Sequence, residues 1–148
     1  MKNKPMKSIV QLLCLGWLMM LVNIVQAEVV DIDNPTLKTL LAEGIPLVDL
    51  RTQGEWAQTG VVAGSIEETF FDEAGKHRAG PWLESVGNQT NGETALILIC
   101  HSGVRSKVVA DWLVANDLYG KVYNVKAGID HWIRSGGSVT MSEAAAAN

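Results

Sequence analysis

The sequence predicts an α/β domain with a central, mostly parallel sheet and helices on both faces. Apolar runs of strand length alternate with helical segments along the chain, an order typical of strand–helix–strand units. The run at residues 95–99 is apolar at every position, as expected of a strand that is covered on both faces. The sequence contains no internal repeat, so we expect one domain.

The first half of this domain contains three runs with the length and apolar character of strands, at residues 29–32, 45–50 and 61–66. Asn34 and Pro35 supply an N-cap and a proline at the first helical position, so a helix should run from there through Ala42 and stop at Gly44. A short helical turn is expected at residues 52–58.

The second half is predicted to contain two further strands, at 95–99 and 122–125, and three helices, around 81–85 and at 106–115 and 129–134. Helical periodicity places four apolar residues of the 106–115 helix toward the core: Val108, Val109, Trp112 and Leu113. The rest of 70–94 is irregular and rich in glycine, asparagine and charge. The alanine-rich tail at 142–148 should be frayed.

The first 27 residues have the pattern of a secretory signal peptide. They contain Lys2, Lys4 and Lys7 but no acidic residue, then an apolar run at 9–25, and finally the small-residue step that ends at Ala27. An uncleaved membrane anchor is the alternative, because about 17 apolar residues approach the length of a spanning helix. We expect cleavage after Ala27, a domain at 28–141 and a periplasmic or secreted protein, which would meet a membrane only through an uncleaved segment.

Loss of the signal segment changes the charge and the cysteine content. Three lysines leave and no acidic residue does, so the formal charge goes from −4 to −7. A net acidic domain without a basic run argues against a nucleic-acid partner. Cys100 is then the only cysteine and has no partner for a disulfide within the chain. A lone exported thiol suggests a function, although a small buried hydrophobic residue is the alternative interpretation.

The reactive chemistry is expected where the 95–99 strand meets the next helix, in the loop Cys100-His101-Ser102-Gly103-Val104-Arg105-Ser106. Ligands of open α/β sheets bind at the carboxyl ends of strands. A loop that wraps into a helix N-terminus directs its N–H groups inward and forms an anion-binding nest. We expect this nest to favour the thiolate of Cys100, with Gly103 allowing the tight backbone and Arg105 offering charge to an oxyanion.

The other polar residues near the loop are assigned lesser roles. His101 should pack or line the substrate rim, because adjacent side chains seldom point at each other, and Ser102 and Ser106 should donate hydrogen bonds into the nest. Asp49 and Arg51 end the 45–50 strand, and we interpret them as a structural ion pair that supports the loop. The two remaining histidines, His77 and His131, lack the spacing of metal ligands, and we expect surface or packing roles for them.

The loop resembles the C-x-x-G-x-R-S active-site signature of the single-domain rhodanese family. The likeness extends to residues 48–65, which resemble the family's D-x-R-x-x-x-E-[WF] … G-x-[IV]-x-G-[AS] stretch, and to its closing segment at 124–137. It spans about residues 30–138. Residues 60–65 lack the usual histidine and proline of that stretch, Ala127-Gly128 replaces the usual Gly-Gly, and residues 70–91 match no motif.

The resemblance implies a rhodanese-like fold and a two-step sulfur transfer. The thiolate of Cys100 would take sulfur from a donor such as thiosulfate and pass it, as a persulfide, to cyanide or a thiol. No metal or organic cofactor would be needed, because the sulfur is carried covalently. The binding residues would be those of the loop: His101, Ser102, Gly103, Val104, Arg105 and Ser106.

Two alternatives to a sulfurtransferase remain. A non-catalytic module that binds sulfide or polysulfide, or senses redox state through its thiol, is the first. A phosphatase or arsenate reductase is the second and is less favoured, because rhodanese-related phosphatases use C-x5-R and this chain has C-x4-R.

Overall fold

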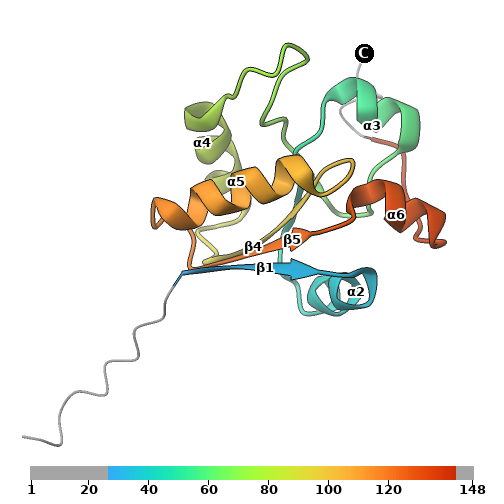
Figure 1. Ribbon diagram of the computed structural model, residues 1–148, viewed down its shortest axis with the longest axis horizontal. Helices are drawn as coiled ribbons and strands as arrows, with labels where there is room; N and C mark the ends of the chain where they lie inside the picture. The colour runs from blue at the N-terminus through green and yellow to red at the C-terminus, as the bar shows by residue number, and fades with distance from the viewer. Residues whose placement is uncertain (1–26, 143–148) are drawn as a thin grey trace, which may run out of the picture.

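The computed structural model describes residues 27–142, which form a five-stranded sheet flanked by helices (Figure 1). The strands are β1 (Glu28–Ile32), β2 (Leu47–Asp49), β3 (Ile66–Glu67), β4 (Ala95–Ile99) and β5 (Lys121–Val125). Their order is β1-β5-β4-β2-β3, and all four pairings are parallel. The predicted α/β class with a mostly parallel sheet is confirmed.

Helices cover both faces of the sheet, as predicted. They are α2 (Asn34–Ala42), α3 (Gln53–Thr59), α4 (Ala79–Gln89), α5 (Val104–Ala115) and α6 (Gly128–Arg134). Trp82 of α4 and Leu113 of α5 belong to the core on one face, whereas Leu37 of α2 and Trp132 of α6 belong to the core on the other. Figure 1 shows α5 and α2 on opposite sides of the sheet.

The central position of β4 explains its unbroken apolar sequence. Leu96 and Leu98 point into the core under α4 and α5, whereas Ile97 and Ile99 point into the core under α2 and α6. All four side chains are fully buried. Successive strand residues face opposite sides of a sheet, so a strand with helices on both sides needs apolar residues throughout.

Two predicted features of the first half are wrong. The N-cap of α2 is Asp33, whose carboxylate accepts a hydrogen bond from the Thr36 N–H at 3.0 Å, and Asn34 lies inside the helix. The strand predicted at 61–66 is interrupted by a turn at residues 63–64, which leaves only β3. Val61 instead exchanges backbone hydrogen bonds with Thr140, so it pairs with the C-terminal segment and not with a strand of the sheet.

The second half differs from prediction in its helix boundaries. Helix α4 is longer than the short helix expected around 81–85, and α5 begins at Val104, so Ser106 lies within its first turn. The expected inward position of Val108 is wrong, since this residue is 55% exposed.

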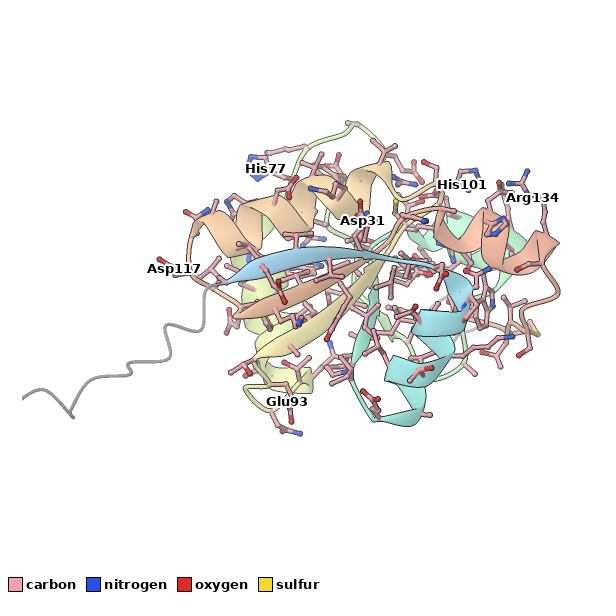
Figure 2. All side chains as sticks on the ribbon, turned by 60° about the horizontal axis from the view of Figure 1, so that its bottom comes forward. Asp31, His77, Glu93, His101, Asp117 and Arg134 are labelled. Carbon is pink, nitrogen blue, oxygen red and sulfur yellow. The ribbon has the colours of Figure 1, made fainter. Side chains whose placement is uncertain are left out.

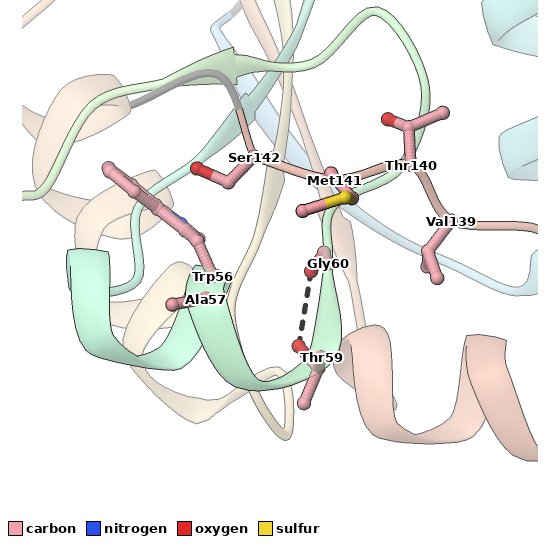
Figure 3. A pocket seen from close by; sticks show the side chains of 8 residues that line it. All are labelled: Trp56, Ala57, Thr59, Gly60, Val139, Thr140, Met141 and Ser142. Atoms are coloured by element: carbon pink, nitrogen blue, oxygen red, sulfur yellow. Dashed lines mark hydrogen bonds between the residues drawn. The ribbon is translucent and has the colours of Figure 1, made fainter. Parts of the chain in front are cut away.

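The C-terminal segment is ordered further than expected. Ser142 is buried, and its hydroxyl donates a hydrogen bond to Glu67 at 2.5 Å, so the tail does not fray at this residue. Figure 3 shows residues 139–142 passing beside Trp56 and Gly60. Residues 143–148 of the predicted tail and 1–26 of the predicted signal segment lie outside the described residues. Among residues 27–142, no helix has the length and apolar character needed to cross a membrane.

Candidate active site

The sulfur of Cys100 lies in a nest of hydrogen-bond donors. Cys100 directly follows β4 and is fully buried. Its Sγ accepts hydrogen bonds from the backbone N–H groups of Gly103 at 3.1 Å and Ser106 at 3.4 Å, and the Ser106 hydroxyl lies 3.3 Å away. These donors converge at the N-terminus of α5, where the helix dipole also favours negative charge. The arrangement suits an anionic sulfur.

Gly103 lets the loop turn sharply into α5. Its φ is +88°, a conformation that residues with a Cβ rarely adopt. A Cβ at this position would lie 2.2 Å from the carbonyl oxygen of Lys126. Glycine is therefore required both by the backbone conformation and by the close approach of the chain after β5.

The N-terminus of α6 holds the other side of the loop. The N–H of Ile129 donates to the Cys100 carbonyl at 2.9 Å, and the N–H of Asp130 donates to the His101 carbonyl at 3.1 Å. Gly128 packs so closely that a Cβ would lie 2.2 Å from the His101 carbonyl oxygen. Ala127, by contrast, has an ordinary φ of −108°, which explains why alanine fits there.

Arg105 is held by Glu55 on α3. Its two terminal nitrogens donate to the two carboxylate oxygens at 2.9 Å and 2.5 Å, and about a third of each side chain is exposed. Burial alone would raise the pKa of Glu55, but hydrogen bonds from Arg105 and the Thr52 N–H, with the charges of Arg105 and Arg51, lower that pKa to about 2. The same hydrogen bond raises the pKa of Arg105. The pair therefore stays ionised at neutral pH.

Asp49 and Arg51 form the predicted ion pair, and both side chains are fully buried. The Arg51 guanidinium donates to both oxygens of Asp49, to the Thr59 hydroxyl at 2.7 Å and to the Gly60 carbonyl at 2.8 Å. Because its donors are used within the protein, Arg51 fixes the end of α3 to the end of β2. This contact positions Glu55, and through Glu55 it positions Arg105.

A hollow of about 240 Å³ adjoins the loop. It is lined by Arg51, Glu55, Gln58, Thr59, His101 and Arg105. A larger hollow, of about 310 Å³, lies beside Trp56 and Met141, but no loop residue lines it (Figure 3). We place the chemistry at the smaller hollow, because two residues of the cysteine loop form part of its wall.

The histidines do not form a metal site. His101 is exposed beside this hollow, and Figure 2 shows it well separated from His77. Among residues 27–142, no group of three or more histidine, cysteine, aspartate or glutamate side chains is placed to hold a metal ion.

The geometry of this loop agrees with the sequence comparisons. A family model described as Rhodanese-like domain matches residues 33–135. The chain belongs to the rhodanese-like family. Thiosulfate sulfurtransferase 18 of Arabidopsis thaliana is 33% identical over 109 residues, which cover 72% of this chain and 79% of that protein.

Two solved structures support the fold of this rhodanese-like domain. A rhodanese-like domain protein of Staphylococcus aureus has 24% identity and a TM-score of 0.50, over 75% of this chain and 98% of that chain. A Rhodopseudomonas palustris protein of unknown function, described as a possible tyrosine phosphatase, has 17% identity and a TM-score of 0.57, over 95% and 99% of the two chains.

The structure places two of the six predicted loop residues at the sulfur and two more at the hollow beside it. Gly103 and Ser106 contact Sγ, Arg105 and His101 line the adjoining hollow, and Ser102 and Val104 face solvent. Sequence reasoning missed two supports of this rhodanese-like site: the Glu55 partner of Arg105 and the Asn124 partner of Ser106. Glu55 is the glutamate of the D-x-R-x-x-x-E-[WF] motif, so the sequence offered a signal for it, but no spacing in the sequence connected Asn124 with the loop.

Proposed function

We propose that this domain is a sulfurtransferase that carries sulfane sulfur as a persulfide on Cys100. The observation that supports it most is the convergence of the backbone N–H groups of Gly103 and Ser106 on Sγ. Donors fixed in place before the reaction stabilise the negative charge of a thiolate or persulfide without having to reorganise. The sulfurtransferase name of the Arabidopsis thaliana relative agrees with this chemistry.

The proposed reaction has two steps. In the first, the Cys100 thiolate attacks the outer sulfur of thiosulfate, a sulfur–sulfur bond forms to Cys100, and sulfite leaves with the electron pair of the broken bond. In the second, a nucleophilic acceptor such as cyanide or a thiolate attacks the terminal sulfur, and the thiolate of Cys100 is released. No electron acceptor and no cofactor is consumed, because the sulfur is carried covalently.

Arg105 is the residue proposed to attract the donor anion. Its side chain is 32% exposed and lines the hollow next to the loop, whereas Arg51 is fully buried. Because Glu55 already neutralises Arg105, the hollow should favour a small anion that shares this guanidinium. The C-x4-R spacing makes a ring of amides shorter than that of the related phosphatases, which favours a sulfur atom over a phosphate.

We propose also that the protein is exported, with cleavage after Ala27. The lysine-rich start, the apolar run at 9–25 and the small-residue step at 25–27 support it. Expression of the full chain in a Gram-negative bacterium, followed by cell fractionation and N-terminal mass, tests this. A periplasmic product beginning at Glu28 is expected, and a full-length membrane-bound product would contradict it.

The experiment that tests the function is thiosulfate:cyanide sulfur transfer by residues 28–148, together with intact mass after exposure to thiosulfate. A gain of one sulfur that cyanide removes is expected. Cys100→Ser, which keeps the size of the side chain but removes the sulfur, should show neither the gain nor turnover, while its circular dichroism matches the parent. A folded parent protein without either signal would contradict the proposal and favour a binding or sensing module.

A further inference from the structure

A chain of hydrogen bonds connects Cys100 with an exposed carboxylate on the edge strand of the sheet. The Ser106 hydroxyl lies 3.3 Å from Cys100 Sγ and 2.6 Å from Asn124 Oδ1. Asn124 Nδ2 in turn donates to Asp31 Oδ1 at 2.8 Å. Ser106 is 0% and Asn124 2% exposed, whereas Asp31 on β1 is exposed. Two buried side chains thus link the sulfur to the surface.

Asp31 fixes the orientation of the Asn124 amide. The two residues are direct partners in the pairing of β1 with β5. A carboxylate only accepts hydrogen bonds, and in an asparagine side chain only the nitrogen can donate. Nδ2 must therefore face Asp31, and Oδ1 must face Ser106. Since Oδ1 only accepts, the hydrogen bond between these residues uses the single proton of the Ser106 hydroxyl.

Asn124 and Cys100 consequently compete for one proton. While Ser106 donates to Asn124, its oxygen can only accept from Cys100, and this matches a thiol. To stabilise a thiolate, the hydroxyl must turn its proton from Oδ1 to Sγ. That rotation would leave Asn124 Oδ1 buried without a hydrogen-bond donor. The energetic cost of an unsatisfied buried acceptor opposes the rotation. The structure therefore contains a local cost for negative charge on Cys100 beside the amides that favour such charge.

We propose that Asp31 and Asn124 are positioning residues that restrain the reactivity of Cys100 by holding the Ser106 proton away from sulfur. Asp31 acts through Asn124, and Asn124 acts through Ser106. This inference rests on the proposed function only in taking Cys100 as the reacting sulfur. It adds a restraint on that sulfur that lies outside the cysteine loop.

Most of the other charged groups around the loop are paired with a group of opposite charge. Arg105 of the loop pairs with Glu55 of α3, Arg51 after β2 pairs with Asp49 at the end of β2, and Asp130 of α6 pairs with Arg134. Lys107, which directly follows the loop, pairs with Asp111, while His101 within the loop and Lys126 after β5 are exposed. Because carboxylates neutralise the guanidinium charges, the direction of the Ser106 hydroxyl proton has a larger influence on whether the sulfur is charged.

The test is the pH profile of Cys100 alkylation by iodoacetamide, measured on donor-free protein. In Asp31→Asn the amide of Asn124 is free to turn and offer Nδ2 to Ser106, whose proton then points at sulfur. We expect the midpoint to fall by about half to one pH unit, which is about three- to tenfold faster alkylation below the midpoint. Asp130→Asn is the matched control, since it removes a carboxylate near the loop that has no hydrogen-bond path to Ser106.

A second comparison separates the proton path from a structural effect. In the background of Ser106→Ala, Asp31→Asn should no longer shift the midpoint, because the hydroxyl that transmits the change is gone. Equal shifts in Asp31→Asn and Asp130→Asn, no shift in Asp31→Asn, or a shift that persists with Ser106→Ala would each overturn the inference.

The outcome is independent of sulfur transfer. If the parent protein transfers no sulfur while Asp31→Asn moves the midpoint through Ser106, the proposed function fails and this inference stands. If the parent transfers sulfur and the midpoint does not move, this inference alone fails.

Discussion

Replacement of Glu55 by glutamine should destabilise the protein at neutral pH and progressively less so in acid. Glu55 accepts two hydrogen bonds from Arg105 and one from the Thr52 N–H that begins α3. Glutamine retains one acceptor oxygen but loses the charge. The change therefore removes the ionic part of the Arg105 contact while α3 can keep its N-terminal hydrogen bond.

The lowered pKa gives the size of the effect. A fall from 4.5 to about 2 would correspond to ~3 kcal/mol if all of it were transferred to stability. Roughly a third of each side chain is exposed, with 28% for Glu55 and 32% for Arg105, and solvent screens the pair. We therefore expect Glu55→Gln to lower the free energy of unfolding by about 1–2 kcal/mol at pH 7.

The sign of the pH dependence follows from the same shift. The pKa of Glu55 is lower in the folded state, so its contribution is complete above the unfolded pKa of 4.5 and is lost as the pH falls through 4.5 toward 2. The difference between parent and Glu55→Gln should shrink to less than half of its neutral value at about pH 3.

Urea unfolding of both proteins at pH 7, 5 and 3 measures this difference. Asp111→Asn is the control, because it removes a carboxylate from an exposed ion pair with Lys107, where we expect a change within about 0.5 kcal/mol. A loss in Glu55→Gln that is the same at pH 3 and pH 7, or no larger than the loss in the control, would refute the reasoning.

Two further substitutions test the supports of the loop. Gly128→Ala should cost about 2–4 kcal/mol in unfolding free energy and abolish sulfur transfer, because its Cβ would lie 2.2 Å from the His101 carbonyl oxygen. The control Ala127→Gly should cost less than about 1 kcal/mol. Equal losses in the two variants would contradict the assigned contact. Arg51→Met should lower the free energy of unfolding by about 3–5 kcal/mol, because it leaves Asp49 buried without its partner. The double variant Asp49→Asn with Arg51→Met should recover part of that loss. Thermal unfolding that shows no recovery would argue against a pairwise role.

The architecture could be predicted from the sequence where local patterns and burial agree. The unbroken apolar run of β4 follows from its place between two helical layers, and Gly103 marks the turn into α5. The strand expected at 61–66 failed because Val61 and Val62 are buried without being part of the sheet. Val61 pairs with Thr140, which lies far away in the chain, and Val62 packs in the core under α2 and α6, so the two have the same local apolar pattern as a strand.

The candidate site was predictable as a loop but not as a network. The residues from Cys100 to Ser106 are contiguous, so one motif is enough to predict a loop whose Gly103 and Ser106 N–H groups face the sulfur. The residues that hold this loop come from other elements: Glu55 is 50 positions from Arg105, and Asn124 is 18 positions from Ser106. Their contacts depend on how α3 and β5 pack beside the loop, which hydrophobic periodicity does not encode.

These two supports act on Cys100 in different ways. Glu55 neutralises the exposed guanidinium of Arg105, so it limits how strongly an anion is attracted to the mouth of the site. Asn124 receives the proton of the buried Ser106 hydroxyl, so it limits how readily sulfur carries charge inside the site. Both oppose features that favour a thiolate. If Cys100 carries sulfur as proposed, its thiol must react with the donor yet resist oxidants, and Glu55 and Asn124 would supply this restraint from outside the cysteine loop.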